Sequence, residues 1–171
     1  MSLIEKIKDC DNPKELMCSF LAIKHRLLSP EVGVATSFTD PVGQYAEYLT
    51  LKAFGGKRTP NGTKGLDIID KNKRKIEVKG RIKRDEKYTP KTDISHSNVE
   101  AKTFEYLVYI VFSQNFEIEY AFGTSLEGFK KIAQKVKHKG RPEKWIFKAK
   151  ESLTKESYVD DLTEIIRKVN T

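Results

Sequence analysis

Apolar residues recur at helical spacing in the first third of the chain. Asn12-Pro13-Lys14-Glu15 is a helix start, because Asn caps a first turn, Pro fits its first position and Glu lies three residues after the cap. The apolar positions that follow recur every three or four residues up to the breaker Ser29-Pro30, so the pattern predicts a helix between them. A second apolar stripe predicts a helix from Val42 to Phe54, ended by Gly55-Gly56.

The middle of the chain carries shorter, more continuous apolar runs that predict strands. Residues 66–69 and 75–79 are joined by a polar turn, which predicts a β-hairpin. Residues 104–112 are almost continuously apolar, as is typical of a central strand, and 116–122 predict the next strand.

The remaining segments predict a loop, two helices and one strand. Gly80 to Lys102 has few apolar residues and many charges, so we expect a long exposed loop. The capping-box pattern at Thr124-Ser125-Leu126-Glu127 predicts a helix through about Val136. Residues 145–147 predict a late edge strand, and the apolar positions from Tyr158 to Val169 predict a closing helix.

This order of elements predicts the α/β class, with one mixed sheet and helices packed against it. The 171 residues suffice for one domain with a full hydrophobic core. We therefore expect a single domain over 1–171, with N-terminal helices in 1–41 and a core in 42–150.

Composition narrows the function classes. No apolar run is long enough to span a bilayer, and the N-terminus lacks the apolar core of a signal peptide, so we expect a soluble, intracellular, cytoplasmic protein without a membrane partner. Lys and Arg exceed Asp and Glu by 32 to 24, and a net charge of +8 favours a polyanionic partner such as nucleic acid. The alternative is a basic surface that only confers solubility.

Three residues of the predicted hairpin carry candidate chemistry: Asp67, Glu77 and Lys79. Side chains alternate between the faces of a strand, so Glu77 and Lys79 point the same way, and Asp67 lies across from them if the register permits. Crowded carboxylates invite a hard divalent cation such as Mg²⁺, and a neighbouring lysine can orient or deprotonate water, or stabilise the developing charge on a phosphate. The alternative is a hairpin whose charges form ion pairs facing solvent.

Gly65-Leu66-Asp67 and Glu77-Val78-Lys79 resemble the two halves of the motif of the PD-(D/E)xK nucleases, which share the restriction-endonuclease-like fold. The resemblance covers about 42–122 and departs from the motif at Leu66, where its name expects Pro. It implies a restriction-endonuclease-like mixed central sheet flanked by helices. It also implies that Asp67, Glu77 and the Val78 carbonyl bind the metal, and that Glu47 on the preceding helix completes the metal shell or holds a second ion.

Basic residues follow the motif closely, as phosphate-contacting side chains beside a metal site would. The predicted DNA-binding residues are Arg81, Lys83, Arg84, Lys87 and Lys91. A solvated charged loop is the alternative. No phosphate loop of the GxxxxGK type is present, and we expect no small-molecule cofactor.

The expected function is Mg²⁺-dependent hydrolysis of phosphodiester bonds in double-stranded DNA, with Mn²⁺ able to substitute. Among the PD-(D/E)xK nucleases that this sequence resembles, we expect a sequence-specific type II restriction enzyme that acts as a homodimer. Three alternatives stay open: a non-catalytic nucleic-acid-binding module of the same fold, an RNA-binding basic domain, and a DNA repair or junction-resolving nuclease.

Overall fold

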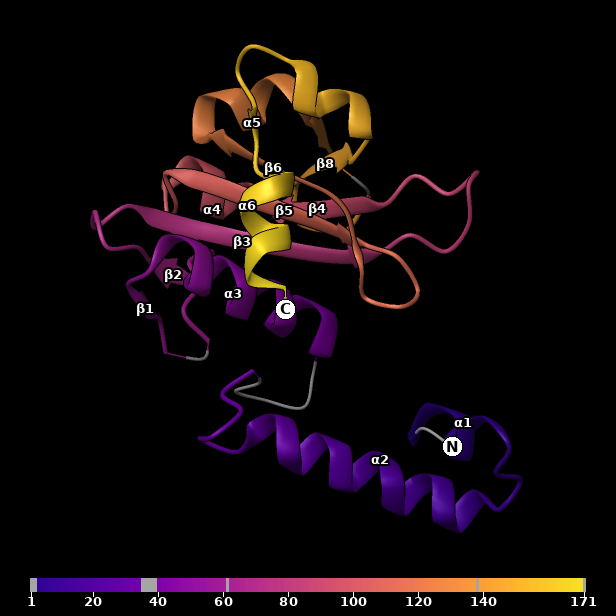
Figure 1. Ribbon diagram of the computed structural model, residues 1–171. Coiled ribbons are helices and arrows are strands. Elements are labelled where there is room, and N and C mark those ends of the chain that lie inside the picture. The colour runs from indigo at the N-terminus through magenta and orange to yellow at the C-terminus, as the bar shows by residue number, and fades with distance from the viewer. Residues whose placement is uncertain (1–2, 35–39, 61, 138, 171) are drawn as a thin grey trace. The chain divides into compact units, whose positions relative to one another are not determined.

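The computed structural model describes residues 3–34, 40–60, 62–137 and 139–170 (Figure 1). The chain divides into two compact units, residues 1–41 and 42–171. In the described part of the chain, no helix combines the length and apolar content needed to cross a membrane.

In residues 3–34, the part of the first unit that the structure describes before residue 40, the helices are α1 (Leu3–Lys8) and α2 (Pro13–Leu28). The predicted cap of α2 is confirmed, because the Asn12 side chain accepts hydrogen bonds from the backbone N–H groups of Lys14 and Glu15. Neither helix contains a buried residue.

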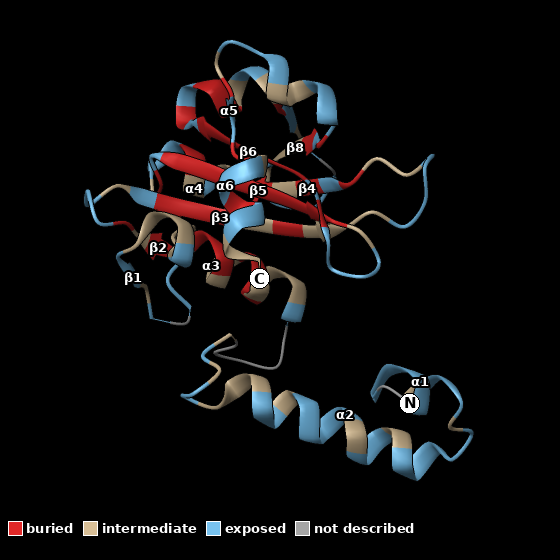
Figure 2. Ribbon diagram, in the orientation of Figure 1, coloured by how far each residue is buried: buried red, intermediate tan, exposed pale blue. Residues whose placement is uncertain are grey.

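A six-stranded sheet forms the centre of the second unit. Its strands, in spatial order, are β1 (Lys57–Arg58), β2 (Ile68–Ile69), β3 (Lys75–Ile82), β5 (Tyr106–Phe112), β6 (Ile118–Ser125) and β9 (Asp160–Asp161). Among these described strands, β3 and β5 pair in parallel and the other neighbours pair antiparallel, so the sheet is mixed. Every residue of β5 is buried, which confirms the prediction of a central strand (Figure 2).

Each face of this sheet covers a hydrophobic core. On one face, α3 (Pro41–Phe54) and α6 (Thr163–Val169) pack Leu49 and Ile166 over the apolar side chains of β3 and β5. Over the other face lie α4 (His96–Glu100), α5 (Leu126–Ile132) and the 3₁₀ turn η1 (Glu151–Lys155).

The same side carries a second sheet of three antiparallel strands. It consists of β4 (Lys91–Ser95), β8 (Lys144–Lys148) and β7 (Gln134–Val136), with β8 in the middle. Figure 1 shows α3 below β3 in this view, and α5 with β8 on the opposite side of the central sheet. The predicted α/β class with a mixed sheet and helices is confirmed.

The prediction of an exposed loop over 80–102 was wrong. The strand β3 continues to Ile82, and β4 and α4 occupy most of the second half of the segment. In β4 only every second residue, Thr92 and Ile94, faces the core, and the polar residues between them hid this alternation.

Three further predictions need correction, because contacts with distant parts of the chain determine where these elements begin, end or pair. The Ser125-capped helix ends at Ile132 rather than Val136, and β7 follows it. Residues 145–147 lie in the middle strand of the second sheet rather than at an edge, so the described residues form two sheets instead of one. Tyr158 precedes the closing helix, which begins at Thr163.

Candidate functional site

The hairpin of β2 and β3 brings Asp67 opposite Glu77. Ile68 pairs with Ile76 in antiparallel register, and the Asp67 N–H donates a hydrogen bond to the Ile76 carbonyl at 3.0 Å. Along β3, Ile76 and Val78 face the core beneath α3, so Glu77 and Lys79 face the other side of the sheet, as the alternation predicts.

Direct hydrogen bonds fix these side chains. The Val78 N–H donates to Asp67 Oδ2 at 2.7 Å, and the Lys79 ammonium donates to Glu77 Oε1. Glu77 is 5% exposed, and its second oxygen, Oε2, is buried without a hydrogen-bond partner among the described residues. A buried carboxylate oxygen without a partner lowers the stability of the folded state. A cation that it coordinates, or a water molecule that donates a hydrogen bond to it, would remove this cost.

The electrostatics of the cluster favour uptake of positive charge. Burial raises the pKa of Asp67 to about 7, and repulsion from Glu77 adds to the shift against the opposing effects of Lys79 and the Val78 N–H. Burial alone would lower the pKa of Lys79, but attraction to Glu77 and Asp67 raises it. Lys79 is therefore a firmly charged ammonium group.

Glu47, on α3, lies near enough for its charge to raise the pKa of Asp67 slightly further. Its carboxylate also forms an ion pair with Arg58 of β1, with 3.9 Å between Oε2 and Nε. The Arg58 guanidinium in turn donates to the Gln44 carbonyl at 3.1 Å. The residue Arg58 was not singled out from the sequence, because nothing local marks a β1 arginine as the partner of a helix carboxylate.

The donor set suits a hard divalent cation held by few protein ligands. In the ranges that the structure describes, no group of three or more His, Cys, Asp or Glu side chains is placed to hold a metal. Mg²⁺ commonly uses only one or two carboxylates, with water and substrate phosphate as its other ligands, and Asp67 and Glu77 supply that number. The Val78 contact seen here is its N–H to Asp67, so metal binding by its carbonyl stays a prediction.

Two of the five predicted DNA-binding residues are held by other protein groups. Arg81 donates to the Gly80 carbonyl and, at 2.9 Å, to the Thr92 hydroxyl. Lys83 forms ion pairs at 3.4 Å with Glu86 and at 3.7 Å with Glu119. Their contact with DNA stays a prediction.

The other three predicted DNA-binding residues are exposed. The Arg84 guanidinium lies 5.5 Å from the centre of the Tyr88 ring, and Lys87 and Lys91 present their side chains at the surface. These three are the most accessible of the set, and no contact with DNA is shown for any of them.

Comparisons with known proteins give no match, either among protein-family models or among curated proteins. The resemblance to the PD-(D/E)xK nucleases therefore depends on the motif residues and on the geometry that they adopt in this chain.

Proposed function

We propose that this protein is a Mg²⁺-dependent DNA endonuclease with a restriction-endonuclease-like core. The observation that carries the proposal is the cluster at the start of β3. There, the buried carboxylate of Glu77 and the half-buried carboxylate of Asp67 lie on one face of a hairpin, beside the ammonium group of Lys79. The mixed sheet between helices and a net charge of +8 are compatible with this function.

The roles of the residues follow from their protonation and contacts. Asp67 and Glu77 would hold Mg²⁺, with Mn²⁺ as a substitute, and the ion would supply charge neutralisation at the scissile phosphate. In the metal-free protein, attraction to Glu77 and Asp67 raises the pKa of Lys79, so this residue is a charged group there. Beside a bound ion, Lys79 would position or activate the attacking water or stabilise charge on the phosphate. Glu47 supports the site through its charge and its ion pair with Arg58.

The substrate in this proposal is double-stranded DNA, and the finer role is sequence-specific cleavage by a homodimer, as for a type II restriction enzyme. A palindromic recognition site would require two copies related by a two-fold axis. This finer role depends on fold-level analogy.

The test is digestion of plasmid and mixed genomic DNA with Mg²⁺ and with EDTA. Wild type is compared with Lys79→Ala and with Lys75→Ala, which removes an exposed lysine from the start of the same strand. Discrete Mg²⁺-dependent bands from wild type and Lys75→Ala, lost in Lys79→Ala, are expected. Nicking or smearing would overturn the restriction role and favour a repair or junction nuclease. Intact DNA that still shifts in a gel would favour the non-catalytic binding module.

A further inference from the structure

The three-stranded sheet carries a second concentration of positive charge. Residues 134–150 hold seven basic residues and one acidic residue, Glu143. The basic ones are Lys135, Lys137, Lys139, Arg141, Lys144, Lys148 and Lys150. A net charge of +6 in 17 residues is most of the excess of the whole chain, and it lies outside the candidate metal site.

The register of the sheet places part of this charge on one face. Lys91 of β4 pairs directly with Lys148 of β8, and Ile146 pairs with Gln134 of β7. The paired residues Thr92 and Phe147 are buried and face the core. Since side chains alternate along a strand, these four residues share the other face of the sheet, which points away from the core. Two lysines directly opposite each other repel, which is a cost that a bound anion removes.

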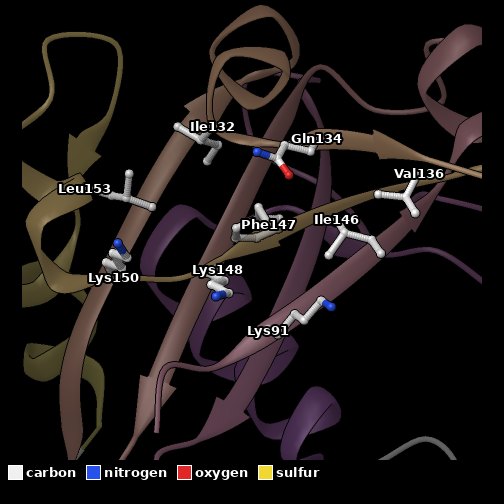
Figure 3. A pocket seen from close by; sticks show the side chains of 9 residues that line it. All are labelled: Lys91, Ile132, Gln134, Val136, Ile146, Phe147, Lys148, Lys150 and Leu153. Atoms are coloured by element: carbon white, nitrogen blue, oxygen red, sulfur yellow. The ribbon is translucent and has the colours of Figure 1, made fainter. Parts of the chain in front are cut away.

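A pocket of about 480 Å³ opens beside these residues, within the size range of about 300–1000 Å³ that is typical of small-molecule sites. It lies where β7 stops pairing with β8, between Ile132 at the end of α5 and Leu153 of η1. Figure 3 shows Phe147 in the middle, the lysines 91, 148 and 150 along one side, and Ile132, Gln134 and Val136 along the other.

The lysines at this pocket are available to a ligand. Lys91, Lys148 and Lys150 are all exposed, and none of them forms an ion pair within the described part of the chain. Lys144, further along β8, is by contrast paired with Asp93. The pocket thus combines apolar walls, the side-chain amide of Gln134 and the three lysine ammonium groups, which form no ion pair with a carboxylate among the described residues.

We propose that this pocket and the surrounding basic face bind a single strand of nucleic acid, with an unpaired base in the pocket and the flanking phosphates on Lys91, Lys148 and Lys150. A base has an apolar face and a polar edge, which match the apolar walls and the Gln134 amide. A duplex would offer this face only its phosphates, because its bases are stacked and paired, and would leave the apolar pocket unused.

The test is fluorescence anisotropy in EDTA with a labelled oligothymidine of about 20 nucleotides, longer than the strand sites of about 4–16 nucleotides seen in other single-strand binders. The variant Lys91→Gln/Lys148→Gln/Lys150→Gln should bind the strand more weakly than wild type. Its slope of log affinity against log salt should be shallower by about 2, since each lost contact with a single strand removes about 0.7. A matched control, Lys14→Gln/Lys130→Gln/Lys168→Gln, removes three helix lysines and should retain the wild-type slope.

Each alternative outcome overturns the proposal. Equal slopes for the variant and the control would show that this face does not contact the strand. An equal loss of affinity for a duplex of the same length would show a plain phosphate surface without a place for an unpaired base. If thymidine monophosphate displaced the labelled strand at a concentration similar to that of the unlabelled oligothymidine, the pocket would be a mononucleotide site instead. No cleavage is measured, and Lys148 and Lys150 are not among the predicted duplex-DNA contacts, so this proposal can fail separately from the proposed nuclease activity.

Discussion

Asp67→Asn should stabilise the metal-free protein at alkaline pH, although Asp67 is proposed to hold the metal. Burial and the neighbouring Glu77 raise the pKa of Asp67 from its ordinary value of 3.8 to about 7. One pKa unit corresponds to about 1.4 kcal/mol, so ionised Asp67 costs the folded state about 4 kcal/mol above pH 7. The asparagine avoids that cost, and its side-chain oxygen can still accept the Val78 N–H.

The sign of the pH dependence follows from which state binds the proton. Because the pKa of Asp67 is higher in the folded state, the folded protein holds a proton that the unfolded chain has released between about pH 4 and pH 7. The contribution of Asp67 to stability therefore falls as pH rises through this window. The advantage of Asp67→Asn over wild type should grow by about 2–3 kcal/mol between pH 5 and pH 8.

Urea unfolding in EDTA at the two pH values measures this difference. The control is Asp70→Asn, which changes a buried carboxylate three residues away that accepts hydrogen bonds from Asn72 and Arg74. This control should lose about 1–3 kcal/mol, because it weakens bonds to a charged acceptor. An Asp67→Asn variant that is less stable than wild type at pH 8, or whose advantage is the same at both pH values, would refute the reasoning. Added Mg²⁺ should stabilise wild type more than Asp67→Asn, since only the former retains both carboxylates.

Three further substitutions test the packing around the central sheet. Gly123→Ala would place a Cβ 2.0 Å from the Tyr106 hydroxyl, so thermal unfolding should reveal a loss of about 2–4 kcal/mol. Tyr109→Phe removes a buried hydroxyl that has no partner among the described residues, so urea unfolding should show unchanged stability or a gain of about 1 kcal/mol. Glu47→Gln breaks the partly buried ion pair with Arg58, and the same measurement should show a loss of about 1 kcal/mol. A gain in that variant would mean that the pair does not stabilise the fold.

Local signals in the sequence predicted several elements well. Asn12 caps α2 with its side chain, as its type and position predicted. The continuous apolar run at β5 indicated a strand buried on both faces, and the polar turn at 70–74 indicated the hairpin. In these cases the residues that decide the structure are neighbours in the chain, so a pattern of a few residues contains the information.

The second sheet could not be predicted in the same way. The strands β4 and β8 stabilise each other through pairs such as Thr92 with Phe147, which are separated by more than fifty positions. The apolar residues 145–147 of β8 predicted a strand, but β4 is short and mostly polar. Its pattern is therefore also that of an exposed loop and did not indicate the pairing. For the candidate site, alternation along β3 predicted that Glu77 and Lys79 share a face, whereas the pairing of Glu47 with Arg58 depends on how α3 packs and has no local signal.

The hairpin itself explains why repulsion between Asp67 and Glu77 persists in the folded protein. The opposite face of β3 contributes Ile76 and Val78 to the core, and the Asp67 N–H and carboxylate are both bonded to backbone groups of β3. Separating the two carboxylates would therefore break backbone hydrogen bonds and uncover apolar surface. Lys79 neutralises one carboxylate oxygen of Glu77 and leaves the other buried without a partner in the described ranges. A second positive charge, either a proton on Asp67 or a bound cation, is what this geometry still requires. The proton and Mg²⁺ compete for the Asp67 carboxylate. Mg²⁺ binding should therefore weaken as pH falls below about 7, because the proton then occupies Asp67.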